Sequence, residues 1–192
     1  MKTNDKEIRS VVELRSADSN TIEGYAVVFD SESQWLGFYE KIAPSAITEE
    51  TLKRSDVFAN LDHDTEKVLA RSRYGKGNLT LTIDERGLKF SFKLLDNELA
   101  RTVKSYVDAG IISSCSFAFT VAEDGDTWER DEDGIDHRTI TKIDRLFDVS
   151  LVYEPAYLET SVSCRSYERY LQDKDNEIQS LCEEILKLEE KI

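Results

Sequence analysis

The stretch Ile111–Thr120, IISSCSFAFT, has the alternating pattern of a β-strand that packs against an aromatic core on one side only. The two faces of this strand are predicted to hold Ser114, Ser116, Ala118 and Thr120 on one side, and Cys115, Phe117 and Phe119 on the other. A buried strand normally has bulky side chains on both faces. Small hydroxyl side chains on one face leave room for a substrate to approach, so this strand is the first candidate for a functional site.

Composition limits the class of protein. The chain has 192 residues, 40% of them hydrophobic, which is enough for one sizeable core with an appendage. The formal net charge of −14 makes binding to nucleic acid or to an anionic membrane surface unfavourable, so we expect a protein or peptide partner. No segment has the length and apolarity of a signal sequence or a membrane span. These features predict a soluble cytoplasmic protein.

The cysteines favour a reducing compartment. There are three, Cys115, Cys164 and Cys182, and none of them form a pair with metal-ligand spacing. We therefore expect free thiols, no zinc site and no other metal.

Strand and helix signals predict a mainly β, α+β protein. Strands are expected at 21–29, 56–61, 79–83, 88–92, 111–120 and 146–153, with a further strand pair joined by the acidic region 123–136. Helices are expected at 46–53 and 97–109, the second capped by Asp96 and ended by Gly110. About seven strands with few helices predict a closed or nearly closed β-barrel with flanking helices.

The C-terminal segment has a different character from about Ser166 onward. Apolar residues recur at spacings of seven, three and four, with Lys174 in the one core position that is not apolar: Leu171, Ile178, Leu181, Ile185, Leu188 and Ile192. This pattern predicts a helix that forms a coiled coil with a partner. The alternative is an amphipathic helix packed back on its own domain. We expect a domain at 1–165 and a C-terminal helix at 166–192.

Three residues have the chemistry of a serine protease site. A serine hydroxyl needs an adjacent base, and the base needs a group that orients it and stabilises its charged form. Ser116, His63 at the end of the strand 56–61, and Asp148 inside an apolar run can fill these roles. Each also has an ordinary structural explanation: a small packing residue, a solvated turn residue and an edge-strand carboxylate.

Six collinear segments, from about residue 8 to 163, carry a family resemblance. They are EGYAVVF (23–29), GFYEKIAPSAI (37–47), DVFANLDHDTEKVLARS (56–72), GNLTLTIDERGLKFSFKL (77–94), SSCSFAF (113–119) and LFDVSLVYEPAYLETSV (146–162). Together they resemble the caudovirus prohead proteases, which mature the capsids of tailed phages. The resemblance implies an assemblin-type fold, as in the capsid proteases of herpesviruses.

The resemblance also implies roles for individual residues. The base of the family corresponds to His63 and its nucleophile to Ser116. The family's glycines on either side of the nucleophile are Ser114 and Ala118 here, which makes Ser114 or Ser113 the second choice of nucleophile.

Two further roles follow from the same alignment. The family's Leu-x-Glu-Val-Ser segment is LFDVS here, which makes Asp148 the orienting acid. By analogy with the herpesvirus fold, the backbone amides of Ala156 and Tyr157 are candidates for stabilising the oxyanion.

Other residues are weaker candidates for a functional role. Cys115 neighbours Ser116 but is expected to face the core, which argues against a cysteine nucleophile. His137 could replace Asp148, as in the His–His arrangement of herpesvirus proteases, but it lies in the acidic region and we expect a solvated loop. A calcium site is disfavoured because the acidic residues lack EF-hand spacing: Asp124, Asp126, Asp131 and Asp133.

The sequence therefore predicts a prohead maturation serine endopeptidase without a cofactor. Its expected substrate is the scaffold protein, or the scaffold-like segment of the major capsid protein, inside the immature prohead in the cytoplasm of the bacterial host. A homo-oligomer such as a dimer is expected, with no nucleic-acid or membrane partner. The alternative is a non-catalytic scaffolding or assembly module that uses the barrel and the coiled coil for protein binding.

Overall fold

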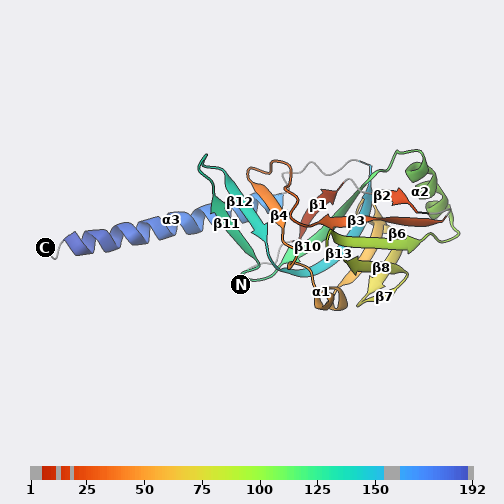
Figure 1. The fold of residues 1–192 in the computed structure, drawn as a ribbon, viewed down its shortest axis with the longest axis horizontal. Helices are drawn as coiled ribbons and strands as arrows, with labels where there is room; N and C mark the ends of the chain where they lie inside the picture. The colour runs from red at the N-terminus through yellow and green to blue at the C-terminus, as the bar shows by residue number, and fades with distance from the viewer. Residues whose placement is uncertain (1–5, 12–13, 18–19, 154–160, 190–192) are drawn as a thin grey trace.

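A computed structural model describes residues 6–11, 14–17, 20–153 and 161–189, and these form three β-sheets and three helices (Figure 1). The largest sheet has six strands and holds the serine strand next to its edge. Its order is β1 (Glu7–Val11), β10 (Ser114–Val121), β13 (Ile143–Val152), β5 (Asp56–Leu61), β6 (Asp64–Arg73) and β7 (Lys76–Gly77). β13 and β5 run parallel, and the other neighbours in this sheet are antiparallel.

Two smaller sheets complete the β structure. One has the order β2 (Leu14–Ser16), β3 (Thr21–Val28), β9 (Gly87–Lys93) and β8 (Leu79–Ile83). The other has the order β11 (Asp126–Arg130), β12 (Asp136–Ile140) and β4 (Tyr39–Ile42). A buried core of aromatic and aliphatic side chains contains Phe90 of β9 together with Phe117 and Phe119 of β10. The aromatic face of β10 thus belongs to the core, as its alternation predicts.

The predicted barrel is wrong. Among the described residues, none of the three sheets closes on itself, and β1 and β7 are the open edges of the largest one. The number of strands in a sequence does not determine which strands become neighbours. Here the parallel pairs β5–β13 and β4–β12 join segments far apart in the chain.

Most of the predicted elements are present, with shifted ends. The hairpin β8–β9, the strand β5 and the strand β3 lie where the alternation places them. Helix α1 (Glu49–Arg54) begins after Thr48, whose side chain accepts a hydrogen bond from the Thr51 amide. Helix α2 (Glu98–Asp108) is capped by Asn97, not by Asp96, and Gly110 after it has a φ of 72°. The strands β1, β2, β4, β6 and β7 were not predicted.

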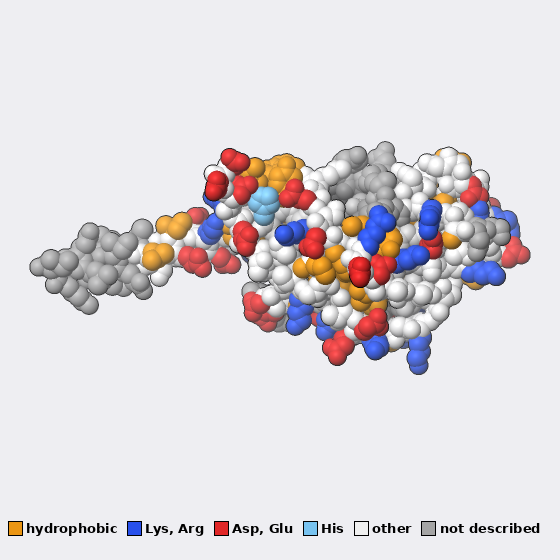
Figure 2. Space-filling model, viewed as in Figure 1, with side chains coloured by type: hydrophobic (Ala, Val, Ile, Leu, Met, Phe, Trp, Pro, Cys, Tyr) orange, Lys and Arg blue, Asp and Glu red, His pale blue; other side chains and the backbone are white. Residues whose placement is uncertain are grey.

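Helix α3 (Ser161–Glu189) extends away from the β-sheets (Figure 1). Its first part is docked, because Tyr167 and Tyr170 stack on Trp128 of β11 with ring centroids 5.7 and 4.5 Å away. Farther along, apolar side chains lie in solvent on the projecting part (Figure 2). Ile178 and Leu181 there are 57% and 58% exposed. The start of the helix packs on β11, as the alternative of an amphipathic helix docked on its own domain predicts. Beyond it, Ile178 and Leu181 of the predicted coiled-coil pattern are exposed. None of the described helices combines the length and the apolarity needed to cross a bilayer.

Candidate active site

Strand β10 places its hydroxyl side chains on the face opposite the aromatic core. Ser116 lies between Ser10 of β1 and Ser150 of β13, each directly across from it in the antiparallel register. Cys115 points the other way, and its thiol donates to the Tyr25 carbonyl at 2.9 Å. The thiol is therefore on the core side, which removes Cys115 as a nucleophile for a site on the Ser116 face.

The turn after β5 carries His63 onto Asp148. Asp62 and His63 both have a φ of 56°, the left-handed conformation that a tight hairpin turn of this kind needs at both central residues. The parallel pairing of β5 with β13 brings this turn beside the strand that holds Asp148. His63 Nδ1 donates to Asp148 Oδ1 at 2.7 Å, across 85 positions of sequence.

The carboxylate of Asp148 is buried, 4% exposed, and has three donors. Besides His63, the Ser150 hydroxyl donates to Oδ1 at 3.1 Å, and Lys6 Nζ donates to Oδ2 at 2.9 Å. Burial alone would raise the pKa of Asp148, but the hydrogen bonds and positive charges of His63 and Lys6 outweigh it and lower the pKa below its usual value. Asp148 is therefore an anion at neutral pH and can hold an imidazolium.

His63 presents its second ring nitrogen to the protein interior. Nε2 is buried and has no hydrogen-bond partner in the described part of the chain. An unpartnered buried nitrogen is costly and calls for an explanation, and a catalytic role is one. With Nδ1 fixed by Asp148, Nε2 is the nitrogen left to exchange a proton with a substrate or a nucleophile.

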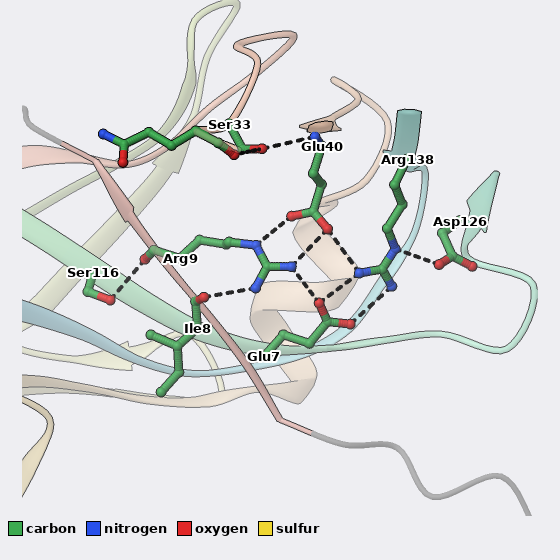
Figure 3. Close-up of polar contacts among 9 residues, drawn as sticks. Glu7, Ile8, Arg9, Ser33, Glu40, Ser116, Asp126 and Arg138 are labelled. Atoms are coloured by element: carbon green, nitrogen blue, oxygen red, sulfur yellow. Dashed lines mark hydrogen bonds and ion pairs between the residues drawn. The ribbon is translucent and has the colours of Figure 1, made fainter. Parts of the chain in front are cut away.

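The Ser116 side chain lies on the same face of the sheet as Asp148, but its hydroxyl has a partner other than His63. Ser116 is fully buried, and its Oγ donates to the Arg9 carbonyl of β1 at 2.9 Å (Figure 3). Its cross-strand neighbour Ser150 contacts the same Asp148 oxygen that accepts from His63. The structure thus brings His63 and Asp148 into contact and places Ser116 on the adjacent strand, with its hydroxyl turned toward β1.

The other sequence candidates are more distant from this arrangement or outside it. Ser114 is buried opposite Val152, and Ser113 is exposed just before β10. His137 lies on β12, where it contacts Asp131 at 3.1 Å and stacks on Tyr39. It does not contact Asp148. Ala156 and Tyr157 lie outside the described residues, so their oxyanion role stays a prediction.

A buried four-charge cluster, whose β1 members lie opposite Phe117 and Phe119 in the register, was not predicted at all. It consists of Glu7 and Arg9 of β1, Glu40 of β4 and Arg138 of β12 (Figure 3). Arg9 contacts both carboxylates, at 2.6 Å to Glu40 and 2.7 Å to Glu7, and so does Arg138, at 2.9 and 2.8 Å. Burial would raise the pKa of Glu40, but the two guanidinium groups lower it. The cluster joins three strands that only the folded chain brings together.

A His–Asp pair beside a strand of serines supplies the base and the orienting acid that a serine hydrolase needs. The model of the caudovirus prohead serine protease family matches residues 7–173, most of the 192-residue chain. The chain belongs to this family, and it is a serine protease of capsid maturation. A protease of this class acts on capsid or scaffold proteins.

A solved structure supports the fold. The bacteriophage T4 capsid assembly protease gp21 matches with a TM-score of 0.52 at 10% identity, covering 78% of this chain and 98% of that chain. At this level of identity the likeness concerns the fold alone. No curated protein sequence matches the chain.

Proposed function

We propose that the protein is an endopeptidase in which Ser116 is the nucleophile, His63 the general base and Asp148 the residue that orients His63. The observation that carries this proposal is the 2.7 Å contact between His63 and Asp148 beside the small-residue face of β10. The pair joins two segments that the fold has to bring together across 85 positions. A buried acid that both accepts from an imidazole and stays ionised is what a serine protease base requires.

The chemistry we propose is that of a serine protease. The Ser116 hydroxyl attacks the scissile carbonyl while His63 Nε2 takes its proton, and Asp148 stabilises the imidazolium that forms. His63 then gives the proton to the leaving amine, and water releases the acyl group from Ser116 by the same steps in reverse order. The Ser150 hydroxyl donates to the Asp148 oxygen that accepts from His63, which makes Ser150 a positioning residue.

The substrate we propose is the scaffold protein, or the scaffold-like segment of the major capsid protein, within the immature prohead in the host cytoplasm. Confinement with the substrate supplies a high local concentration, so tight binding is not needed. The exposed apolar residues Leu171, Ile178 and Leu181 of α3 are suited to hold the enzyme there, by pairing with a helix of the scaffold or capsid protein or with a second copy of the protease.

Co-expression with the major capsid protein of the same phage tests this function. Particles made with the wild-type enzyme should contain shortened capsid or scaffold polypeptides. Particles made with Ser116→Ala should assemble with full-length polypeptides. Ser10→Ala, a change in the facing serine of β1, is the matched control and should still give shortened products. Shortened products with Ser116→Ala would rule out Ser116 as the nucleophile and favour Ser113 or Ser114.

A further inference from the structure

Strand β1 covers the strand that carries the proposed nucleophile. It runs antiparallel to β10, with Ile8 opposite Ala118, Arg9 opposite Phe117 and Ser10 opposite Ser116. Among the described strands, β10 is its single neighbour in the sheet. An edge strand with one neighbour is held by one ladder of backbone hydrogen bonds, so its removal leaves the other ladders of the sheet in place.

Two contacts connect β1 and the residue before it to the proposed catalytic groups. The Arg9 carbonyl accepts the hydrogen bond of the Ser116 hydroxyl, which keeps this hydroxyl turned away from His63. Lys6 pairs with the Asp148 oxygen that His63 does not use. Ser116 is 0% exposed with β1 in place, so no peptide carbonyl can reach its Oγ.

The buried ion pairs that hold β1 join residues of β1 to residues of β4 and β12, and each group contains both an acid and a base. β1 contributes one acid and one base, Glu7 and Arg9, to the four-charge cluster. If β1 leaves, the remaining residues of the cluster are still paired, because Arg138 contacts Glu40 at 2.9 Å and Asp126 at 2.7 Å. Breaking up a buried ion pair is costly because it leaves an unpaired charge. Departure of the whole strand removes both of its charges together and avoids that cost.

We propose that β1 is a blocking strand: Ser116 becomes available when β1 leaves the edge of β10, and an extended substrate peptide then binds in the place of β1. This inference rests on the proposed role of Ser116. Replacement of one strand by another restores the backbone ladder of β10 and presents the incoming peptide to the nucleophile. The cluster residues Glu40 and Arg138 then face the incoming strand, so they favour a peptide with an acidic and a basic residue two positions apart, as in Glu7 and Arg9.

A reversible cross-link tests the blocking role in the full chain. Directly paired antiparallel residues have Cα atoms about 4.5–5.5 Å apart, within the range of about 4.4–6.8 Å that a disulfide spans. The double variant Ile8→Cys/Ala118→Cys can therefore lock β1 to β10. The readout is the rate at which a fluorophosphonate labels Ser116, with the cross-link verified by mass spectrometry, and Ile8→Cys alone is the control for oxidation.

The oxidised variant should be labelled at least about tenfold more slowly than the same protein after reduction, because labelling follows the open fraction. Equal rates before and after reduction would overturn the blocking strand and leave the proposed function intact. Absence of Ser116 labelling in both the reduced variant and the wild type would instead overturn the proposed function.

A second variant should release β1 without leaving an unpaired charge behind. Glu7→Gln/Arg9→Gln removes one negative and one positive charge of β1 together and weakens its attachment. Labelling should therefore be at least about tenfold faster than in the wild type. The matched control is Arg15→Gln/Glu23→Gln, which removes an exposed ion pair between β2 and β3 and should leave the rate unchanged. A folded Glu7→Gln/Arg9→Gln protein that is labelled no faster than the wild type would contradict the proposal.

A peptide tests the exchange itself. KEIRSV, the sequence of residues 6–11, should slow labelling of the Glu7→Gln/Arg9→Gln variant by about threefold or more when it fills most of the open sites. KQIQSV, which lacks both charges, should have a weaker effect. Equal effects of the two peptides would show that Glu40 and Arg138 do not select the incoming strand.

Discussion

Replacing Asp148 by Asn is the sharpest test of the His–Asp pair. The change keeps the shape of the side chain and removes the negative charge that accepts from His63 Nδ1 at 2.7 Å. In the reaction His63 becomes an imidazolium, with its charge about 4 Å from the carboxylate. At an effective dielectric constant of about 20, that attraction is worth about 4 kcal/mol. The rate should therefore fall about 10³-fold.

The assay is the second-order rate constant for fluorophosphonate labelling, which needs an activated serine and no knowledge of the substrate. Asp84→Asn is the matched control, because Asp84, in the turn between β8 and β9, accepts a hydrogen bond of the same 2.7 Å length from Tyr25. We expect the control to be labelled at the wild-type rate. A folded Asp148→Asn protein labelled within about threefold of the wild type would refute the orienting role, since this corresponds to less than about 1 kcal/mol.

Three further predictions concern stability and assembly. Arg138→Met should lower the free energy of unfolding by about 3–5 kcal/mol because it leaves the two buried carboxylates of Glu7 and Glu40 with the single guanidinium of Arg9. Arg15→Met, which removes the exposed partner of Glu23, should cost less than about 1 kcal/mol in urea denaturation. Asp136→Asn should loosen the start of α3, seen as faster amide hydrogen exchange around Tyr167, because Asp136 accepts from Tyr167 and Tyr170. The Arg130 guanidinium and these hydroxyls lower the pKa of Asp136 to about 2. The contribution of ionised Asp136 to stability is therefore complete above its unfolded pKa near 3.8 and is lost as the pH falls through about 2. Hydrogen exchange at the start of α3 that changes with neither the substitution nor the pH would contradict this prediction. Ile178→Asp should reduce incorporation of the protease into particles without changing its melting temperature, and normal incorporation would exclude α3 as the tether.

Local features of the structure could be predicted from the sequence. Alternation in SSCSFAF separates the aromatic core from the serine face, and the structure confirms it because Cys115 and Ser116 have partners on opposite sides of β10. The hairpin β8–β9 is equally local. The chemistry of the residues makes His63 and Asp148 candidates for one site, and the family resemblance favours their pairing, since nothing in the spacing of 85 positions indicates a contact.

Non-local pairing could not be predicted. The strand β1, EIRSV, alternates charged and less polar residues and looks like a solvated segment until Glu40 and Arg138 are placed against it. β6 begins with the polar run DTEK, which hides its pairing with β5. The barrel was predicted from strand number, and closure depends on pairings such as β4–β12 that no local pattern reveals.

The residue that forms a covalent bond with a fluorophosphonate tests the central claim most directly. Tandem mass spectrometry of the labelled wild-type protein should place the label on Ser116, and His63→Ala should lose the label. Modification of Ser113 or Ser114 in place of Ser116, or labelling that persists in His63→Ala, would contradict the catalytic arrangement.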